Sequence, residues 1–350
     1  MKRIGNLYNK IVDIDNIKLA HKNARKGKTH YTEVKQIDSN IDYYCTLISN
    51  MLVNKTFKNS EYEIFIKNDK GKERTIYKLP YFPDRIVHHA IMQVLEPIWK
   101  KIFIKTTYQS IKGRGVHKAK NDVFQTIQSI NSSTVYYGQL DIKKFYPSVD
   151  TSIMFTLVTK KIKCKDTQWL LAQIIFSMDG LPIGNYLSQY LGNLYLTYFD
   201  HYIKETLKVK HYFRYCDDIV ILSNSHTEIC ENIKSINKKL QELNVEIKGF
   251  PKIDDLDNGL DFLGFVFKPR CILLRKRIAD NFKKSVRRFR YNPTEKEFNS
   301  IISYNGWIVA SDSYNLWNRY VTNKLKLIVH NIGLSNKVIN INKRNVNVHK

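Results

Sequence analysis

The stretch FRYCDDIVIL, residues 213–222, places two adjacent aspartates between two short apolar and aromatic runs. The flanking runs, HYFRY and IVIL, have the composition of β-strands, and the short span between them predicts a hairpin turn. Asp217 and Asp218 would then lie side by side at a tight turn, where their charges repel each other at pH 7. A turn of this kind is costly unless positive charge compensates it, so it restricts what the chain can fold into.

A third carboxylate belongs with this pair. The segment TVYYGQLDI, residues 134–142, predicts a strand that ends at Asp141. Strand ends and hairpin turns hold side chains rigidly, and carboxylates held close together raise one another's pKa unless a cation neutralises them. Mg²⁺ prefers oxygen ligands and accompanies phosphates, and two such ions about 4 Å apart can activate a hydroxyl and stabilise a leaving oxygen. The three acids therefore predict a nucleotidyl-transfer site.

The charge of the chain points to a polyanionic partner. Lysine and arginine number 57 against 32 aspartates and glutamates, which gives a net charge of +25. Such an excess favours nucleic acid or an anionic membrane, with a surface adapted for solubility as the alternative. No apolar run approaches the ~20 residues of a membrane-spanning helix, and MKRIGNLYNKIVDIDN has no apolar signal-peptide core. We therefore expect nucleic acid rather than a membrane, and a cytoplasmic location.

Metal-binding and disulfide patterns of other kinds are missing from the sequence. The five cysteines form no C-x-x-C pair, which argues against a zinc ribbon or a disulfide framework. The histidines form no HExxH pattern, and the adjacent pair His88 and His89 is interpreted as ordinary helix packing or as solvated. The acids are therefore the only metal-binding pattern that the sequence offers.

The remaining segments predict a mixture of helices and strands. Residues 1–60 look helical, and alternation around NDKG predicts a hairpin over 61–79 that turns at Asn68–Gly71. Helical spacing appears in three further places: residues 85–103, residues 151–178 and the segment after Gly184. The run LDFLGFVF, residues 260–267, predicts one more strand, with Gly264 at a place where another backbone approaches closely.

The C-terminal part carries much of the positive charge. Residues 268–350 hold 18 lysines and arginines against four acids, a net charge of +14. Within NFKKSVRRFR, one helical face carries Phe282, Val286 and Phe289. The other face carries four basic residues, Lys283, Lys284, Arg287 and Arg288. This division favours contact with a nucleic-acid backbone over a merely solvated helix face.

Taken together, the motifs resemble those of reverse transcriptases. YxDD between apolar strands, downstream of a strand-terminal aspartate, resembles the palm of that family. Six further segments resemble the family's motifs in the same order: RTIYKLP, DRIVHHAIMQVLEPIWKKIF, YQSIKGRGVHKA, DIKKFYPSVD, LPIGNYLSQ and LDFLGFVF. The resemblance covers residues 60–320 and implies an α+β right-hand polymerase.

Two positions narrow the resemblance. Most members carry a glutamine before the motif glycine and a proline after the motif serine, where this chain has Ile183 and Gln189. That combination resembles the reverse transcriptases of diversity-generating retroelements, as do LYNKI, ARKGK and SYNGWIVASDSYNL (303–316). The NAxxH and VTG motifs of retron enzymes are missing, and group II intron enzymes keep the glutamine.

The resemblance implies a division into three parts. Fingers would comprise residues 1–85 with 152–179. The palm, a ferredoxin-like antiparallel sheet backed by helices, would comprise 86–151 and 180–268. A basic helical thumb would comprise 269–350.

The resemblance also implies roles at the reaction centre. Asp141, Asp217 and Asp218 would be the catalytic residues and would hold two Mg²⁺ ions, with the backbone carbonyl of Ile142 as a further ligand. Tyr146 would lie under the sugar of the incoming dNTP and exclude a 2′-hydroxyl. The alternative is that Tyr146 is an aromatic residue packed in the core.

Other implied roles concern the substrates. Lys72 and Arg74 would bind the triphosphate, with Lys78 as a rival, because basic groups stabilise the charge that builds on phosphate oxygens. The dNTP-binding loop would include Ile183, Gly184 and Gln189, and Ser188 and Gly192 would allow its helix to approach neighbours.

Nucleic-acid contacts would involve Arg114 and the basic face of Lys283, Lys284, Arg287 and Arg288. Arg114 would contact either the template or the triphosphate. Lys248 is a weaker candidate for donating a proton to pyrophosphate.

The resulting hypothesis is an RNA-directed DNA polymerase that copies a template-repeat RNA into cDNA with misincorporation at template adenines. Its partners would be template RNA, a cDNA primer strand, dNTPs and a basic accessory variability protein. Ile183 would offer only surface where a glutamine could hydrogen-bond near the sugar, and losing a contact of about 1–2 kcal/mol relaxes discrimination roughly tenfold. The alternatives are a reverse transcriptase of another bacterial lineage, defence-related or retron-like, an enzyme that extends DNA without a template, or an RNA-binding protein that keeps the fold without polymerising.

Overall fold

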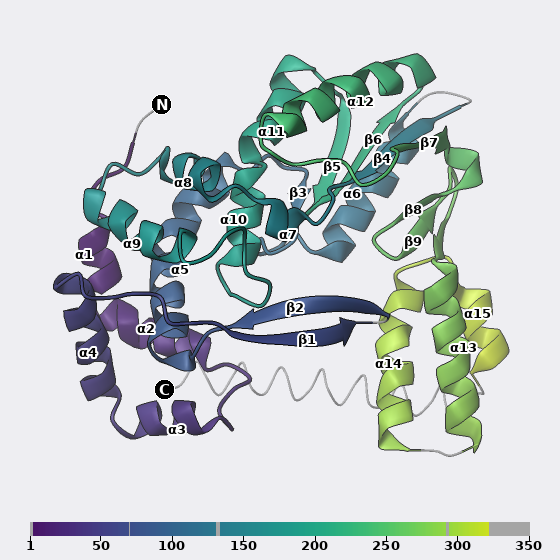
Figure 1. Ribbon diagram of the computed structural model, residues 1–350. Coiled ribbons are helices and arrows are strands. Elements are labelled where there is room, and N and C mark those ends of the chain that lie inside the picture. The colour runs from purple at the N-terminus through teal and green to yellow at the C-terminus, as the bar shows by residue number, and fades with distance from the viewer. Residues whose placement is uncertain (1–2, 70, 131–133, 292–293, 322–350) are drawn as a thin grey trace. The chain divides into compact units, whose positions relative to one another are not determined.

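The computed structural model describes residues 3–321 except for 70, 131–133 and 292–293. The chain forms two compact units (Figure 1). The first comprises Met1–Ala119 with Tyr136–Ile253, and the second comprises Lys120–Val135 with Asp254–Lys350. In the described part of the chain, no helix is both long and apolar enough to cross a membrane.

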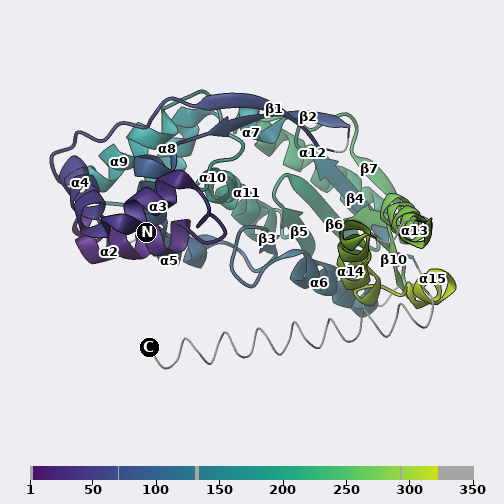
Figure 2. The same cartoon turned by 90° about the horizontal axis from the view of Figure 1, so that it is seen from below.

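The first unit begins with helices, as the sequence predicted for residues 1–60. These are α1 (Tyr8–Val12), α2 (Ile14–Ala24), α3 (Thr32–Ser39) and α4 (Ile41–Val53). Asp13 caps α2, because its carboxylate accepts hydrogen bonds from the backbone N–H groups of Asp15 and Asn16. α5 (Ile86–Trp99) packs on α2 through a mostly buried apolar face. In both views, α2, α4, α5, α8 (Thr151–Thr159) and α9 (Lys165–Ile175) gather at the same end of this unit (Figures 1 and 2).

The predicted hairpin over 61–79 is confirmed as β1 (Glu63–Asp69) and β2 (Lys72–Lys78). The Asn68 side chain accepts a hydrogen bond of 2.9 Å from the backbone N–H of Gly71, whose φ of 85° suits glycine. A helical turn, Tyr81–Arg85, follows and leads into α5. The hairpin is thus joined directly to the helical end of the unit.

The central sheet has the strand order β3-β5-β6-β4-β7. Its strands are β3 (Thr107–Tyr108), β4 (Tyr136–Asp141), β5 (His211–Tyr215), β6 (Asp218–Ser223) and β7 (Lys252–Asp255). β6 pairs antiparallel with both β4 and β5, whereas β3 pairs parallel with β5. α12 (His226–Gln241) lies close on this sheet because Gly138 of β4 has no side chain: a Cβ there would come within 3.0 Å of the side chains of Ile229 and Ile233.

The segments between β4 and β5 are helical, as predicted. They include α7 (Phe145–Ser148), α8, α9, α10 (Ser188–Tyr195), α11 (Thr197–His201) and the helical turn Tyr202–Thr206. A short turn, Lys100–Ile102, ends α5. The helix expected after Gly184 begins at Ser188, so the residues from Gly184 to Leu187 remain in the preceding loop.

The second unit combines helices with a three-stranded antiparallel sheet in the order β10-β9-β8. The strands are β8 (Leu260–Phe262), β9 (Phe265–Phe267) and β10 (Ile272–Leu274). The helices are α13 (Lys276–Tyr291), α14 (Glu295–Val309) and α15 (Tyr314–Tyr320), with a turn at Leu256–Asn258, and α6 (Val116–Ser129) enters this unit from Lys120 onward.

The prediction of a single strand over 260–267 is wrong. The segment is a hairpin that turns at Leu263 and Gly264, whose φ angles of 57° and 86° match a type I′ turn. A leucine in the left-handed region gives no turn signal, which is why the sequence reads as continuous. The close approach at Gly264 also comes from side chains rather than from a backbone, because a Cβ there would meet the Trp307 ring at 2.8 Å and Ile278 at 2.9 Å.

The adjacent histidines of α5 are packed rather than solvated. His88 is 1% exposed and His89 is 8% exposed, and the His89 ring stacks on Tyr186 at a centroid distance of 3.9 Å. Burial lowers the pKa of His88 to about 3, and burial together with the nearby charge of Arg85 lowers the pKa of His89 to about 4. Both imidazoles are therefore neutral in the folded protein at pH 5.

These histidines predict a loss of stability in mild acid. The unfolded chain binds protons on both histidines as the pH falls through about 6.5, whereas the folded chain does not, so their contribution to the free energy of unfolding falls from that pH downward. Between pH 7 and pH 5, His88→Asn should lose about 1–2 kcal/mol less stability than the wild type in urea unfolding. Equal losses in the two proteins would show that His88 is protonated in the folded state.

Candidate active site

The turn that carries two of the predicted catalytic acids, named the catalytic turn and defined as Tyr215–Asp218, joins the ends of β5 and β6. Tyr215 pairs with Asp218, so only Cys216 and Asp217 lie between the strands. Cys216 has a φ of 59° and Asp217 does not have a positive φ, as expected for a type II′ turn. Glycine usually takes the first central position of such a turn, and a cysteine there must be held by its surroundings.

The three predicted acids meet at one end of the sheet. Asp141 is the last residue of β4 and pairs directly with Asp218, the first residue of β6. Residues directly opposite in an antiparallel pair have neighbouring side chains on one face. The backbone N–H of Ile142 donates to the carbonyl of Asp217 over 3.4 Å, which brings the turn against the end of β4. The structure thus brings Asp141, Ile142, Asp217 and Asp218 to the same end of the sheet.

The electrostatics of Asp217 reflect this crowding. Burial raises the pKa of the Asp217 carboxyl, and the charge of Asp141 raises it further. The positive charge of Arg74 acts in the opposite direction. Arg74 lies on β2, so the β1–β2 hairpin presents a guanidinium to the acids.

Lys248 lies directly on the acidic cluster. Its backbone N–H donates to the carbonyl of Asp141 over 2.8 Å, and its Nζ lies 2.9 Å from Asp141 Oδ2. The hydrogen bond and charge of Asp141 raise the pKa of Lys248, with smaller contributions from Asp218 and Asp217. The proton-donating role of Lys248 stays a prediction, and the structure shows its direct contact with Asp141.

The donor set fits a hard divalent cation. Within the described ranges, no three carboxylate, imidazole or thiol groups converge closely enough to hold a metal ion. The acids nevertheless supply only oxygen donors, which Mg²⁺ prefers. Burial, followed by the charge of Asp141, raises the pKa of Asp217, and a bound cation would act against both causes.

The loop before α10 lies on the β1–β2 hairpin. The backbone N–H of Tyr77 on β2 donates to the carbonyl of Ile183 over 2.8 Å. Gly184 has a φ of 112°, and a Cβ there would come within 2.9 Å of the Ile76 side chain. The glycine therefore allows this loop to lie against β2. Gln189 is exposed and accepts a hydrogen bond of 2.8 Å from Ser110.

Comparison with known proteins identifies the family. A family model described as reverse transcriptase (RNA-dependent DNA polymerase) matches residues 65–267, which is more than half of the chain. The chain belongs to the reverse transcriptase family. The predicted fold class, the α+β class of right-hand polymerases, is thereby confirmed, whereas the boundaries of fingers, palm and thumb remain predictions.

Individual relatives of this chain are distant. It is 23% identical over 237 residues to the group II intron-encoded protein LtrA of Lactococcus lactis subsp. cremoris, a match that covers 64% of this chain and 38% of that protein. It is 26% identical over 154 residues to protein YkfC of Escherichia coli (strain K12), which covers 41% of this chain and 40% of that protein. The matches thus span about two fifths of the length of these relatives. A solved apo telomerase from Candida Tropicalis, truncated from its C-terminal domain, shows a TM-score of 0.46 and 11% identity over 65% of this chain and 59% of that chain.

Tyr146 lies beside the catalytic turn. Its hydroxyl is 3.7 Å from the Cys216 sulfur, and burial raises its pKa well above the ordinary range. The neighbouring Phe145 is buried and packs against Gly192, where a Cβ would come within 3.2 Å of the ring. Phe145 is therefore the core residue of this pair, while Tyr146 is partly exposed next to the acids.

The basic residues predicted for the substrates occupy different surroundings. Lys72 begins β2, but its side chain lies outside the described part. Lys78 pairs with Glu63 over 2.7 Å. Arg74 of the same hairpin instead lowers the pKa of Asp217 through its positive charge. Arg114 donates to the carbonyl of Ile104 over 2.6 Å, so its side chain also stabilises the segment between these two residues.

The basic face predicted for nucleic acid lies on α13 in the second unit. Lys284, Arg287 and Arg288 are exposed, and Phe282 and Val286 are buried. Lys283 is partly buried and pairs with Asp280 over 3.1 Å. A surface pocket of about 330 Å³ between α13 and α14 includes Lys284 and Arg288 in its wall. The part of the predicted thumb from residue 322 onward lies outside the described residues.

A group of buried polar residues next to the catalytic turn was not predicted from the sequence. Arg214, Asp200 and Asn193 are all at most 2% exposed, and Arg214 bonds to both of the others. The available signal was an arginine as the fourth residue of an otherwise aromatic strand, HYFRY. A charged residue at an inward position requires a buried partner, which the sequence does not identify.

The crowding of the acids predicts opposite effects of one substitution on stability and on cation binding. Without divalent cations, Asp217→Asn should raise the melting temperature by a few degrees, because it removes a poorly compensated charge beside Asp141. Addition of Mg²⁺ should raise the melting temperature of the wild type but have a smaller effect on Asp217→Asn. The exposed Asp179→Asn serves as the matched control and should respond to Mg²⁺ as the wild type does. Equal Mg²⁺ effects in all three proteins would contradict a cation site at Asp217.

Proposed function

We propose that this chain is an RNA-directed DNA polymerase that copies RNA into cDNA by nucleotidyl transfer. The observation that carries the proposal is the assembly of Asp141, Asp217 and Asp218 at the paired ends of β4 and β6 in a reverse transcriptase domain. A protein that only bound RNA would gain nothing from this repulsion. The acids would instead hold Mg²⁺, and we propose two ions, with the Ile142 carbonyl as a further ligand. Bound divalent cations would neutralise phosphate charge and lower the pKa of the attacking hydroxyl.

The chain's own residues would bind and orient the nucleotide. Arg74 would hold the triphosphate together with Lys72 of the same strand. The positive charge of Arg74 lowers the pKa of Asp217, which supports a place for Arg74 near the acids. Tyr146 would lie under the sugar and exclude a 2′-hydroxyl. The ammonium of Lys248, kept protonated by Asp141, would supply positive charge and a proton near the leaving group.

The nucleic-acid partners would be a template RNA and a cDNA primer strand. The net charge of +25 supports sequence-independent binding of phosphates, and α13 offers exposed Lys284, Arg287 and Arg288. Lys283 would contribute less to binding because it is paired with Asp280. Arg114 would contribute by shaping the loop before α6.

We further propose that the enzyme belongs to a diversity-generating retroelement and misincorporates at template adenines. The supporting feature is Ile183 in the loop before α10, because its side chain cannot hydrogen-bond and its backbone is held on β2. Gln189 supports the same subgroup. This assignment would add a template-repeat RNA and a basic accessory variability protein as partners, and a cytoplasmic location.

A primer-extension assay tests the activity. Purified protein, Mg²⁺ and dNTPs on a DNA-primed RNA template should extend the primer, and Asp217→Asn should abolish extension while Asp179→Asn should not. Products from the wild type would be sequenced to locate errors. A wild type that extends no primer, with or without a basic accessory protein, would contradict the proposed polymerase.

Substitution of Ile183 tests the subgroup. Ile183→Gln should lower errors at template adenines roughly tenfold, because it restores a polar contact worth about 1–2 kcal/mol near the sugar. Ile183→Leu keeps an apolar side chain and should leave the error spectrum unchanged. Errors spread evenly over the four template bases in the wild type would favour a reverse transcriptase of another bacterial lineage.

A further inference from the structure

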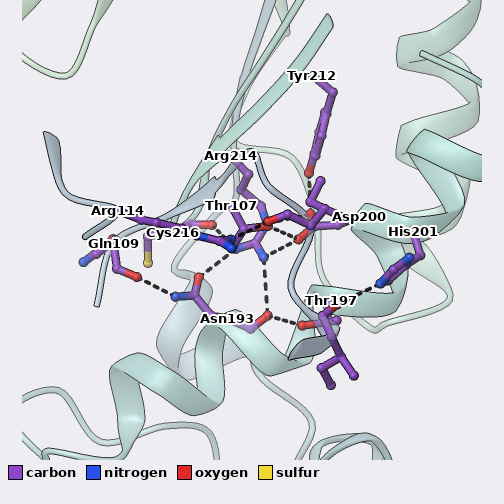
Figure 3. Close-up of polar contacts among 12 residues, drawn as sticks. Thr107, Gln109, Arg114, Asn193, Thr197, Asp200, His201, Tyr212, Arg214 and Cys216 are labelled. Carbon is purple, nitrogen blue, oxygen red and sulfur yellow. Dashed lines mark hydrogen bonds and ion pairs between the residues drawn. The ribbon is translucent and has the colours of Figure 1, made fainter. Parts of the chain in front are cut away.

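A closed ion pair lies beneath the catalytic turn. Arg214 lies in β5 and Asp200 in α11, and both side chains are 0% exposed. The Asp200 carboxylate accepts from Arg214 Nε over 2.7 Å and from Arg214 Nη2 over 2.6 Å (Figure 3). This is the planar two-bond geometry that a guanidinium forms with a carboxylate.

Every donor of the Arg214 guanidinium has an acceptor. Besides the two bonds to Asp200, Nη1 donates to the Asn193 side-chain oxygen over 3.0 Å, and Nη2 donates to the Asn193 carbonyl over 3.3 Å. The fifth bond runs from Nη1 to the carbonyl of Cys216 over 2.9 Å (Figure 3). An arginine has five N–H donors, and a lysine, with three donors on one atom, could not make this set of bonds.

The carboxylate of Asp200 is equally saturated. Its two oxygens also accept from the Tyr212 hydroxyl over 2.6 Å and from the Thr107 hydroxyl over 2.8 Å. Asn193 in turn donates to the carbonyl of Gln109 over 2.8 Å. The members of the network are therefore held by several bonds each, and the network reaches the catalytic turn through the bond to Cys216.

That bond acts on the peptide that decides the geometry of the turn. Type I′ and type II′ turns differ in the orientation of the central peptide, here the peptide between Cys216 and Asp217. Cys216 is left-handed without being glycine, so its conformation has to be imposed by contacts. A donor fixed on the Cys216 carbonyl holds this peptide in one orientation, and Asp217 is the next residue along the chain.

We propose that Arg214, anchored by Asp200 and Asn193, is the positioning residue of the catalytic turn, and that it sets the orientation of Asp217 for cation binding. The inference rests on the proposed polymerase function. Arg214 does not touch substrate and acts only through the Cys216–Asp217 peptide.

Stability alone does not account for the pair. Burying two charges costs free energy, and neutral replacements of buried ion pairs are often tolerated or even stabilising when both partners are replaced together. One of the five donors of Arg214 bonds to the catalytic turn. A need to fix the orientation of the Cys216–Asp217 peptide for the reaction would explain why a buried arginine is kept at this position.

The test compares two sets of changes in the same network. Arg214→Met with Asp200→Asn removes both charges together, so that neither ion is left buried alone, and it leaves the Cys216 carbonyl without its donor. Tyr212→Phe is the matched control, because it removes one bond to Asp200 and none to the turn. We would measure kcat, the KM for dNTP, the Mg²⁺ concentration at half-maximal rate, the melting temperature and its rise with Mg²⁺.

The double variant should lose about 100-fold in kcat, as expected for a displaced reacting group, with a KM for dNTP within about threefold of the wild type. Its half-maximal Mg²⁺ concentration should rise, and Mg²⁺ should raise its melting temperature less than that of the wild type. Tyr212→Phe should lower the melting temperature while kcat and the Mg²⁺ dependence stay unchanged.

Unchanged kcat and Mg²⁺ dependence in a folded double variant would overturn the inference while leaving the polymerase intact. Equal losses of kcat in both variants, in proportion to their melting temperatures, would also overturn it. A wild type that extends no primer would count against the proposed function alone, and the Mg²⁺-induced rise in melting temperature then decides the inference. If the double variant does not fold, the single variant Asn193→Ala, which removes an anchor of Arg214 without removing a charge, replaces it with the same expected outcomes.

Discussion

Repulsion among three carboxylates is the constraint around which the first unit is organised. Asp141 and Asp218 face each other across β4 and β6, and Asp217 projects from the turn between β5 and β6. Like charges opposite each other destabilise a sheet, so the surrounding structure must hold them there. The backbone of Lys248 pairs with that of Asp141, its ammonium lies on the Asp141 carboxylate, and the charge of Arg74 acts on Asp217. Each of these contacts comes from a different segment of the chain.

Buried polar residues also hold the turn between β5 and β6. The network of Arg214, Asp200 and Asn193 ties the turn to α10 and α11, and through Gln109 to the segment after β3. A second contact joins the same segment to α10 at the surface, where Ser110 donates a hydrogen bond to Gln189. The loop before α10 is held in turn by β2 through Ile183.

Features that neighbouring residues encode were predicted, whereas contacts between distant segments were not. The turn at Asp217 and Asp218, the hairpin at Asn68–Gly71 and the helix of α5 were all predicted, because each is encoded by neighbouring residues. The segment 260–267 was misread because Leu263 adopts a left-handed conformation that its residue type does not signal. The contact of Lys248 with Asp141 was not predicted because it joins residues 107 positions apart.

The sequence by itself determined the acids, the order of the motifs and the strands that carry them, since periodicity and turn composition are local properties. Through those motifs it also determined the family. Only the tertiary structure decided how the acids are compensated and which buried partners hold them. Arg214 and Asp200 are 14 residues apart, and nothing in the spacing shows that they bond. Their pairing follows from burial, because a charge removed from water has to find an opposite charge in whatever segment folds against it.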